Sequence, residues 1–478
     1  MGEVTELKGQ QPACQTDDGA GATCACAAAG GLEDLYSVPV DRRVMVIGGG
    51  ICGITAAIDL GNADYRVVMV ERLPSVGGRM LQLSETFPTL DCAQCTLTPR
   101  TVESGQHPHV TLKTCCEVVG LSGEPGNFRV RVRQNKTYVD WSKCTGCGTC
   151  IQKCPTKSYA LFERDAGRMT AIYTLSPQAV PNKPVIDADR CRYLTKGKCG
   201  VCAKVCPVDA IDYEQQESYF EVEVGAIIVA TGFDVYDWKT KMPELGGGRL
   251  PDVIDGLTFE RYLSASGPTA GRMVRPSDGV EPKEIVFIQC AGSRNPELHK
   301  SYCSKVCCMY TAKHARLYKH KVHDGQVYIF YIDIRSTGKG YEQFIQQSVS
   351  EEGIIYLRGR AAKVFQEGKK IMVQGADTLT GKKIEIAADL VVVAAALVPN
   401  EGAEELAEIL GLTCNKDGFF VEEDYKLSPV DSGSRGIFIA GCCQGIKDIA
   451  DTVAQGSAAA SKAQVFLSTI RRQKKQAV

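Results

Sequence analysis

Eight cysteines gather in two runs between residues 144 and 207. The first run has the spacing C-x2-C-x2-C-x3-C-P, and the second keeps the closing C-x2-C-x3-C-P after a wider gap of seven residues. Thiolates at these intervals hold pairs of [4Fe–4S] clusters, and the last cysteine of each run then ligates the cluster of the other run. The spacing therefore predicts two one-electron carriers. One is assigned to Cys144, Cys147, Cys150 and Cys206, and the other to Cys191, Cys199, Cys202 and Cys154.

A structural zinc site and a set of disulfides are the alternatives for these cysteines. Zinc sites rarely place eight cysteines in two such runs, and disulfides do not suit a chain in which no export signal is recognised. The chain has 23 cysteines among 478 residues, which also favours metal ligation in a reducing compartment. Because the doubled motif is the signature of a bacterial-type ferredoxin, residues 137–215 are predicted to form a small α+β ferredoxin domain.

A glycine-rich turn earlier in the chain predicts a dinucleotide site. The apolar run 43–47 leads into Gly48-Gly-Gly50-Ile-Cys-Gly53 and an Ala-rich segment, and a second apolar run ends in Glu71. This is G-x-G-x-x-G between a strand and a helix, followed by an acid. Gly48 permits the tight turn, Gly50 lets the pyrophosphate approach the backbone, and Gly53 lets helix and strand pack. The helix N-terminus then holds the pyrophosphate, and Glu71 accepts a hydrogen bond from a ribose hydroxyl.

Further segments resemble two-dinucleotide-binding flavoproteins, and this resemblance implies FAD rather than NAD at the first site. Gly77-Gly-Arg79 is similar to their FAD-supporting segment, and residues 436–442 are similar to the strand that holds the ribityl chain, although Cys442 replaces the usual acid. A helix that starts at Lys447 is expected to aim its positive N-terminus at the flavin. Lys447 would add charge that tunes the flavin, or is an exposed surface lysine. The cofactor contacts predicted here are Gly78, Arg79, Thr231, Gly232, Gly441, Asp448 and Thr452.

Two alternating segments predict that the ferredoxin domain is an insertion. Residues 128–133 and 219–225 alternate apolar and charged side chains as half-buried strands do, and both cysteine runs lie between them. If the two strands pair as a hairpin, the insertion lies at its tip, where insertions are tolerated. The predicted division is a Cys-bearing tail at 1–38, an FAD-binding domain at 39–136, 216–282 and 396–470, the insert, a second Rossmann-like domain at 283–395, and a basic tail at 471–478.

The second Rossmann-like domain is predicted to be degenerate. Where nicotinamide-dependent relatives carry another G-x-G-x-x-G, residues 289–294 read Gln-Cys-Ala-Gly-Ser-Arg. A pyrophosphate needs the close glycine approach, so NAD(P) binding there is not expected. Cysteines occupy the region instead, as ligands of a third cluster or as buried or reactive thiols. They are Cys290, Cys303, Cys307 and Cys308.

Four more cysteines allow several interpretations. Cys92-x2-Cys95 is consistent with a redox disulfide beside a flavin, with half of a cluster site, or with two buried thiols. Cys24 and Cys26 lie in the tail, either as incidental thiols or as ligands of a cluster docked on the next domain.

Several of these segments together resemble the A subunit of heterodisulfide reductase and its bacterial relatives, over about residues 41–470. The segments are Gly77–Leu83, Thr86–Cys95, Cys144–Cys150, Tyr302–Tyr310 and Lys447–Gln455. The resemblance implies an FAD-centred iron–sulfur protein with a thioredoxin reductase-like fold and a cluster on Cys290, Cys303, Cys307 and Cys308 near the flavin. It also makes a fourth cluster on Cys24, Cys26, Cys92 and Cys95 a reasonable hypothesis.

Implied partners are B- and C-like subunits, or an equivalent hydrogenase- or dehydrogenase-linked electron-transfer protein, together with ferredoxin and a second copy of the chain. The long members of the family carry a folded N-terminal cluster domain and a C-terminal two-cluster ferredoxin. This sequence has only the short tails in their place, so one electron branch is expected to be missing or to be supplied by another subunit.

Composition narrows the function classes. The net charge is -1, which favours neither nucleic acid nor an anionic membrane as a partner. No apolar run of about 18 residues occurs, so a membrane span is not expected. A cytoplasmic location is expected.

These observations predict an oxidoreductase subunit that passes electrons between clusters, FAD and partner proteins. No Ser-His-Asp or Cys-His set is evident, so the chemistry is assigned to the cofactors. The resemblance adds flavin-based electron bifurcation as a hypothesis. The alternatives are a peripheral subunit of a quinone-interacting membrane complex, a stand-alone NAD(P)H-linked flavin reductase, and a non-enzymatic iron–sulfur scaffold or redox sensor.

Overall fold

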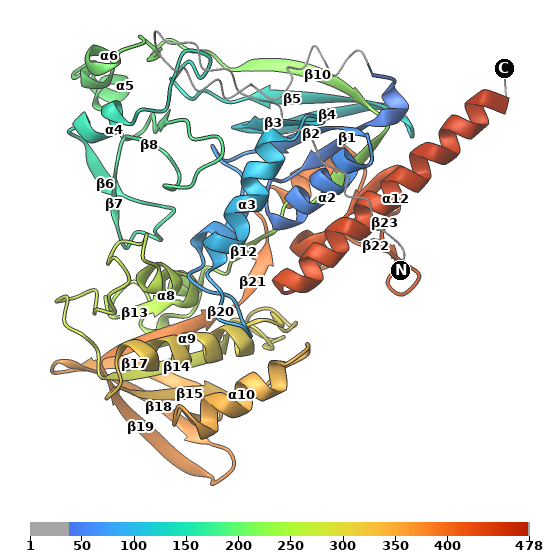
Figure 1. Ribbon diagram of the computed structural model, residues 1–478. Helices are drawn as coiled ribbons and strands as arrows, with labels where there is room; N and C mark the ends of the chain where they lie inside the picture. The colour runs from blue at the N-terminus through green and yellow to red at the C-terminus, as the bar shows by residue number, and fades with distance from the viewer. Residues whose placement is uncertain (1–37, 477–478) are drawn as a thin grey trace, which may run out of the picture.

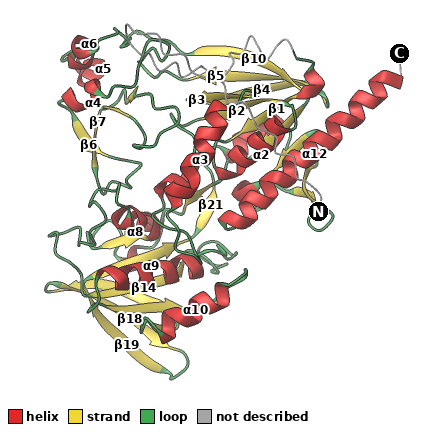
Figure 2. Cartoon of the chain, in the orientation of Figure 1, coloured by secondary structure: helices red, strands yellow, loops and turns green. Residues whose placement is uncertain are grey.

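The computed structural model describes residues 38–476, with the side chains of residues 38–471. Two α/β units lie one above the other in Figure 1, and a smaller part with short helices and strands projects from the upper unit. Figure 2 shows that helices and strands occur in all three parts. None of the described helices combines the length and apolar character that a membrane crossing requires.

The upper unit is built on a sheet with the strand order β22-β23-β24-β11-β1-β2-β3, in which the strands from β24 to β3 are parallel. Its strands are β22 (Glu422–Asp424), β23 (Ser428–Ser432), β24 (Ile437–Ile439), β11 (Ala226–Val229), β1 (Arg43–Ile47), β2 (Arg66–Glu71) and β3 (Val110–Thr114). The central strands are continuous runs of buried β-branched residues, as parallel strands covered on both faces require.

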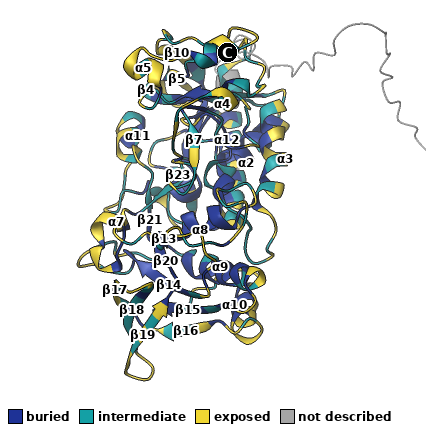
Figure 3. Ribbon diagram, turned by 90° about the vertical axis from the view of Figure 1, so that its left-hand side faces the viewer, coloured by how far each residue is buried: buried dark blue, intermediate teal, exposed yellow. Residues whose placement is uncertain are grey.

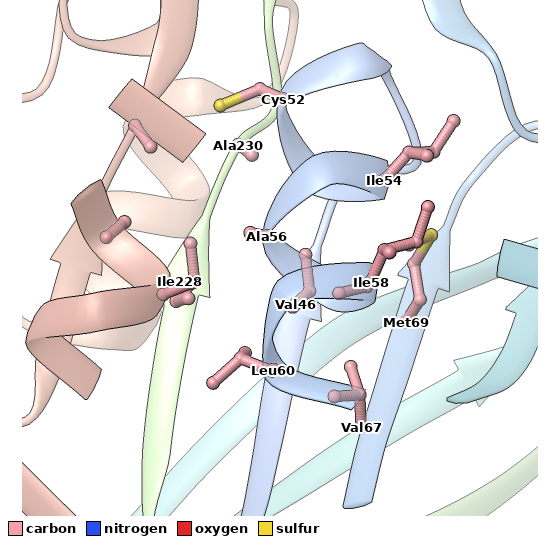
Figure 4. Packing of buried hydrophobic residues seen from close by; sticks show 14 of the residues in the cluster. Val46, Cys52, Ile54, Ala56, Ile58, Leu60, Val67, Met69, Ile228 and Ala230 are labelled. Atoms are coloured by element: carbon pink, nitrogen blue, oxygen red, sulfur yellow. The ribbon is translucent and has the colours of Figure 1, made fainter. Parts of the chain in front are cut away.

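Helices cover one face of this sheet. They are α2 (Ile51–Asn62), α3 (Ala93–Gln106) and α12 (Ile449–Gln476). Ile54 and Ile58 of α2 pack over Val67 and Met69 of β2, as Figure 4 shows. Alanines such as Ala460 let α12 lie close to α2 in the same apolar cluster.

A three-stranded antiparallel sheet covers the other face, together with α11 (Ala403–Leu410). Its strands are β4 (Cys116–Glu124), β5 (Asn127–Gln134) and β10 (Ser218–Val224). The predicted alternation is present, since Val130 and Val132 are buried while Arg129 and Arg131 are exposed. The predicted hairpin is also present, because β5 and β10 pair from Phe128 opposite Val224 to Gln134 opposite Ser218.

The insert follows the end of β5 in the chain and precedes the start of β10. It contains α4 (Thr149–Lys153), β6 (Lys157–Tyr159), β7 (Arg168–Thr170), β8 (Ile172–Tyr173), β9 (Val185–Ile186), α5 (Arg192–Lys196) and α6 (Val201–Val205). Two short antiparallel pairs, β6–β7 and β8–β9, hold its loops, and a small apolar cluster that includes cysteines forms its core.

The lower unit has a five-stranded parallel sheet with the order β13-β20-β14-β15-β16. Neighbouring residues of β14 serve opposite faces: Phe287 packs toward the helices, and Val286 packs toward an antiparallel three-stranded sheet. The elements are β13 (Val253–Asp255), β20 (Leu390–Ala395), β14 (Glu284–Ala291), β15 (Gln326–Tyr331), β16 (Ile355–Arg358), α8 (Gly256–Leu263), α9 (Cys307–Lys321), α10 (Tyr341–Ser350), β17 (Ala361–Glu367), β18 (Lys370–Asp377) and β19 (Lys382–Ala388).

Two antiparallel strands, β12 (Phe233–Val235) and β21 (Leu397–Pro399), connect the units, and β12 leads into α7 (Trp238–Lys241). In Figure 3 the buried residues continue from the upper sheet into the lower one. The fold class predicted from the sequence, two dinucleotide-binding-type α/β units with an inserted cysteine-rich domain, is confirmed.

The end of the chain differs from the predicted helix, which stops at residue 470. Helix α12 continues through Gln476. Arg, Gln and Lys residues have high helix propensity, and cations are favoured in the last turns of a helix, so the basic segment prolongs the helix.

Two ion pairs fix the insert to the lower unit. The guanidinium of Arg261 on α8 donates from Nε to Glu163 of the insert at 2.8 Å and from Nη2 to the other carboxylate oxygen at 3.2 Å. Arg164 donates to Asp255, the N-cap of α8, at 2.8 Å. The side chains of Arg261 and Asp255 are each 1% exposed, so both pairs have one fully buried partner.

Replacing Glu163 with Ala is expected to destabilise the protein, because the buried Arg261 guanidinium would lose its carboxylate. Breaking a buried ion pair costs roughly 3–5 kcal/mol. Thermal unfolding under anaerobic conditions should give a Tm several degrees lower. Glu103→Ala is the matched control, since its partner Arg100 is 50% exposed and such pairs contribute about 0–1 kcal/mol. Equal Tm values for the two variants would contradict this assignment.

Candidate functional site

A cavity of about 740 Å³ lies where the upper unit, the insert and the lower unit meet. The strands β1, β2 and β11 point their carboxyl ends at it, which is where α/β sheets bind ligands. Most of the predicted dinucleotide contacts line it. They are Gly48, Gly50, Glu71, Gly78, Arg79, Thr231, Gly232, Lys447, Asp448 and Thr452. Gly53 and Gly441 are not part of the lining.

The three fingerprint glycines have different geometries. A Cβ at Gly53 would lie 1.9 Å from the carbonyl oxygen of Gly48, so α2 reaches β1 only because residue 53 has no side chain. Gly48 has φ +105°, and a Cβ there would lie 2.4 Å from the oxygen of Ala230. At Gly50, by contrast, no heavy atom of the described chain would lie within 4 Å of an added Cβ. The space beside Gly50 is the cradle that a pyrophosphate needs.

Glu71 joins the glycine turn to the end of β2. Its Oε2 accepts a hydrogen bond from the backbone N–H of Gly49 at 2.7 Å, and its Oε1 accepts one from Leu73 at 2.8 Å. Burial raises the pKa of Glu71, while these two hydrogen bonds lower it. The carboxylate therefore holds the turn in shape at the position that the fingerprint gives to the ribose-binding acid.

Arg79 and Thr231, which also line the cavity, differ in how their polar groups are used. The Arg79 guanidinium forms an ion pair with Asp234 and donates to Gln82 at 3.1 Å. Thr231 Oγ1 is buried, and none of the described residues forms a hydrogen bond with it. An orphaned hydroxyl on a cavity wall is expected where a bound group supplies the partner. Together with the open space at Gly50, Thr231 fits a dinucleotide in this cavity.

The segment before α12 closes one end of the cavity. Lys447 folds back, and its Nζ donates to the carbonyl oxygens of Gly441 and Gly445 at 3.0 and 2.8 Å. Burial lowers the pKa of Lys447, and the nearby thiols of Cys442, Cys443 and Cys52 raise it.

Asp448 caps α12, since its Oδ1 accepts from the N–H of Asp451 at 2.8 Å, and its Oδ2 accepts from the hydroxyl of Tyr341 at 2.9 Å. The Tyr341 bond joins this segment to α10 of the lower unit. Thr452 follows on the first turn of α12, with Cys442 Sγ 3.9 Å from its hydroxyl.

Three titratable residues of the lower unit also reach the cavity, and the sequence analysis missed them. Glu260 accepts from His314 at 2.6 Å and forms an ion pair with Lys313, and all three side chains are at most 3% exposed. Burial raises the pKa of Glu260, but Lys313 and His314 bring it far below its ordinary value. Charged residues inside helices usually face solvent, so no local signal marked them.

The insert brings one predicted set of cluster ligands together. Cys154, Cys191, Cys199 and Cys202 line a second, small cavity, although Cys154 belongs to the first run. The hydroxyl of Tyr213 is 2.9 Å from the sulfur of Cys202 in the same wall. The donor set of four thiols fits a [4Fe–4S] cluster.

In the other predicted set, Cys144, Cys150 and Cys206 share the apolar core of the insert, and Cys147 is exposed. Cys150 lies within electrostatic reach of Cys144 and Cys147. Cys206 packs in the same apolar cluster, and its sulfur accepts from the N–H of Ala210 at 3.3 Å.

The cysteines of the lower unit meet at the end of β14 and the start of α9. Cys290, Cys307 and Cys308 are buried and Cys303 is half-buried. The hydrogen bond from Cys307 lowers the pKa of Cys290 to about 7, and Arg294 and Arg360 lower it as well. A helix N-terminus and cations both favour thiolates, which are the ligands of iron–sulfur clusters.

Cys92 and Cys95 lie at the start of α3, with sulfurs 2.7 Å apart. Both are exposed, so the interpretation as two buried thiols is wrong. Cys24 and Cys26 lie outside the described residues. Within residues 38–476, no three His, Cys, Asp or Glu side chains are arranged to hold a single metal ion.

Comparison with known proteins matches two parts of the chain to described families. Residues 143–210 match a 4Fe-4S dicluster domain, and residues 46–111 match an NAD(P)-binding Rossmann-like domain. Among solved structures, thioredoxin reductase of T. acidophilum aligns with a TM-score of 0.48 and 13% identity, over 89% of this chain and 98% of that one.

Curated relatives align over almost the whole chain, which spans about two thirds of their own length. The A subunit of H(2):CoB-CoM heterodisulfide,ferredoxin reductase from Methanothermobacter thermautotrophicus is 43% identical over 97% of this chain and 71% of its own length. The iron-sulfur A subunit of CoB--CoM heterodisulfide reductase from Methanocaldococcus jannaschii is 46% identical over 90% of this chain and 65% of its own. An A-subunit-like protein of heterodisulfide reductase from Archaeoglobus profundus is 44% identical, over 91% and 68%.

The relatives are similar to almost the whole chain, and this includes both the cavity lined by the glycine turn and the two cysteine runs. The chain therefore belongs to the heterodisulfide reductase A-subunit family, a family of iron–sulfur oxidoreductases.

Proposed function

We propose that this chain is the FAD-binding electron-transfer component of a heterodisulfide reductase-like complex, and that it passes electrons between [4Fe–4S] clusters, FAD and partner proteins. The observation that carries the proposal is a single cavity with the dinucleotide cradle at Gly50, bordered on one side by the cysteine insert and on another by Tyr310 next to Cys307. Electrons that arrive at either cysteine group would reach the same bound dinucleotide.

FAD, when bound, supplies the exchange of one or two electrons. The residues of this chain have other tasks. The turn at Gly48–Gly53 and the N-terminus of α2 would hold the pyrophosphate. Glu260 and Lys313 place buried charge on the cavity wall beside His314, whose pKa is lowered by burial, and charge tunes a potential most strongly where water is excluded. Lys447 adds a partly buried ammonium group to the cavity wall, in the segment before α12.

The partners belong to the proposal as well. The relatives are named as A subunits, so B- and C-like subunits, or an equivalent electron-transfer protein, are the expected companions. The M. thermautotrophicus relative is named for two acceptors, a heterodisulfide and a ferredoxin. We extend the proposal to the same branching of electrons at the flavin of this chain.

A stand-alone NAD(P)H-linked reductase is the second candidate, because the lower unit has the architecture of a nucleotide-binding domain. The turn after β14 argues against it. Cys290 and Gly292 both have positive φ there, and the segment runs on through a loop to Cys307 without a G-x-G-x-x-G turn.

Gly50→Val is expected to lose FAD without unfolding the chain. The new side chain has open space around it in the described structure, but it fills the place where the pyrophosphate approaches. FAD content of the purified protein should fall below about a tenth of the wild-type value, with iron content and Tm of the apo-flavin form unchanged. Gly53→Ala is the contrasting variant, since its Cβ collides with Gly48 and should impair folding itself. Full FAD content in Gly50→Val would refute the site.

Cys154→Ser is expected to remove one cluster of the insert, because Cys154 lines the small cavity with the three cysteines of the second run. Iron should fall by about four atoms per chain, measured by metal analysis and low-temperature EPR of the dithionite-reduced protein. Cys414→Ser serves as the control, because Cys414 is half-buried and packs with the upper core, away from the insert. Unchanged iron in Cys154→Ser would contradict the ligand assignment.

The isolated chain should accept electrons from reduced ferredoxin and not from NADH, since the clusters offer a route and the degenerate turn offers no pyrophosphate site. Bleaching of flavin absorbance in anaerobic stopped flow measures this, and rapid bleaching by NADH would favour the second candidate.

A redox titration of the same preparation tests the branching of electrons at the flavin. Widely crossed one-electron potentials of the flavin are expected, and ordinary, uncrossed potentials would exclude branching.

A further inference from the structure

The insert contacts the segment of the upper unit that follows β2. The N–H of Val76 donates to the carbonyl oxygen of Val180 in the insert at 2.9 Å, and the N–H of Val180 donates to the hydroxyl of Ser75 at 3.1 Å. Ser75 and Val76 follow β2 and are both buried. The insert is therefore anchored on the segment that follows β2.

The insert also contributes side chains to the cavity of about 740 Å³. Tyr173, Leu175, Asp187 and Arg190 form one such group, which lies in the insert around the β8–β9 pair. The pair holds Tyr173 opposite Val185, and the N–H of Asp187 donates to the carbonyl oxygen of Ala171 at 2.8 Å. These side chains are thus positioned by the backbone of the iron–sulfur domain rather than by the flavin domain.

Cys115 and Leu73 link this group to Glu71. Tyr173 lies within electrostatic reach of Asp187, Cys115 and Arg190. The N–H of Cys115 donates to the carbonyl oxygen of Leu73 at 3.0 Å, and the N–H of Leu73 donates to Glu71. In a dinucleotide-binding unit, the acid at the end of the second strand marks the adenosine ribose. Tyr173 therefore stands at the adenosine end of the cavity.

The chemistry of the group suits an adenine. Tyr173 lines the cavity, and aromatic rings stack on bases for about 1–3 kcal/mol. Burial raises the pKa of Tyr173, so its phenol stays neutral. Arg190 is held in place by Asp187, which its Nε contacts at 3.2 Å, and by the carbonyl oxygen of Tyr159.

We propose that the inserted iron–sulfur domain builds the adenosine-side wall of the FAD site, with Tyr173 as the surface against which the adenine lies. This inference rests on the proposed FAD site and adds a role for the insert beyond electron transfer. FAD affinity and the docking of the insert on the flavin domain are then coupled, because the docked insert is what brings Tyr173 to the cavity.

We would measure the binding of FAD and of FMN to the flavin-free, cluster-loaded chain. Because FMN lacks the adenosine, the comparison separates an adenosine contact from a general loss of flavin binding. Tyr173→Ala should weaken FAD binding about 10-fold, the loss of roughly 1.4 kcal/mol of stacking, and leave FMN binding unchanged. Tyr173→Phe should keep the wild-type FAD affinity. Tyr159→Ala is the matched control, since this tyrosine of the same insert is 60% exposed and lies outside the cavity lining.

Three results would overturn the inference: unchanged FAD binding in Tyr173→Ala, equal losses for FAD and FMN, or an equal loss in Tyr159→Ala. If Tyr173→Ala loses iron, Tyr173→Leu replaces it, because leucine keeps apolar volume in the insert without an aromatic face. Failure of the wild-type chain to bind either flavin would instead refute the FAD site itself.

Discussion

The contact between Gly53 and the carbonyl oxygen of Gly48 is the constraint on which the rest of the site depends. An added Cβ would lie 1.9 Å from that oxygen, so α2 approaches β1 only through the absence of a side chain. This approach sets the direction of the N-terminus of α2, which faces the cavity. It also fixes Gly49, whose N–H is held by Glu71 at 2.7 Å, and so joins the ends of β1 and β2 into one rigid rim. A site that binds a doubly charged pyrophosphate needs such a preformed rim, because disordered donors would have to be ordered on binding.

The other two parts of the molecule are attached to this rim through specific contacts. The insert contacts the turn after β2 through Val180 and contacts α8 through Glu163 and Arg164. The lower unit contacts the start of α12 through Tyr341. A dinucleotide in the cavity would therefore touch all three parts, and these contacts hold the cysteine groups at fixed positions around it. Fixed spacing suits electron transfer between bound centres.

The lower unit keeps the architecture of a nucleotide-binding domain but carries cysteines at the turn where such a domain carries glycines. Its parallel sheet and helices keep the packing of a nucleotide-binding domain, with alternating residues of β14 buried on both faces. The glycine turn is replaced by Cys290 and the loop to α9, and the helix N-terminus that would have faced a phosphate instead faces thiols. The same positive end of a helix stabilises either anion, so the change from nucleotide to thiolate needs few substitutions.

The sequence alone determined the elements whose chemistry depends on spacing along the chain. The two cysteine runs, the glycine turn with its strand and helix, and the alternating strands that flank the insert all follow from local periodicity, and the structure has them where they were expected. Only the tertiary structure decided which distant groups meet. It buried Glu260 with Lys313 and His314, and it brought Tyr173 of the insert near Cys115, into the cavity that Glu71 also lines. Local patterns cannot show these contacts, because contacts between residues far apart in the chain depend on how whole helices and strands pack. A charged or aromatic residue in a short segment also has the same sequence pattern whether its side chain faces water or a cavity.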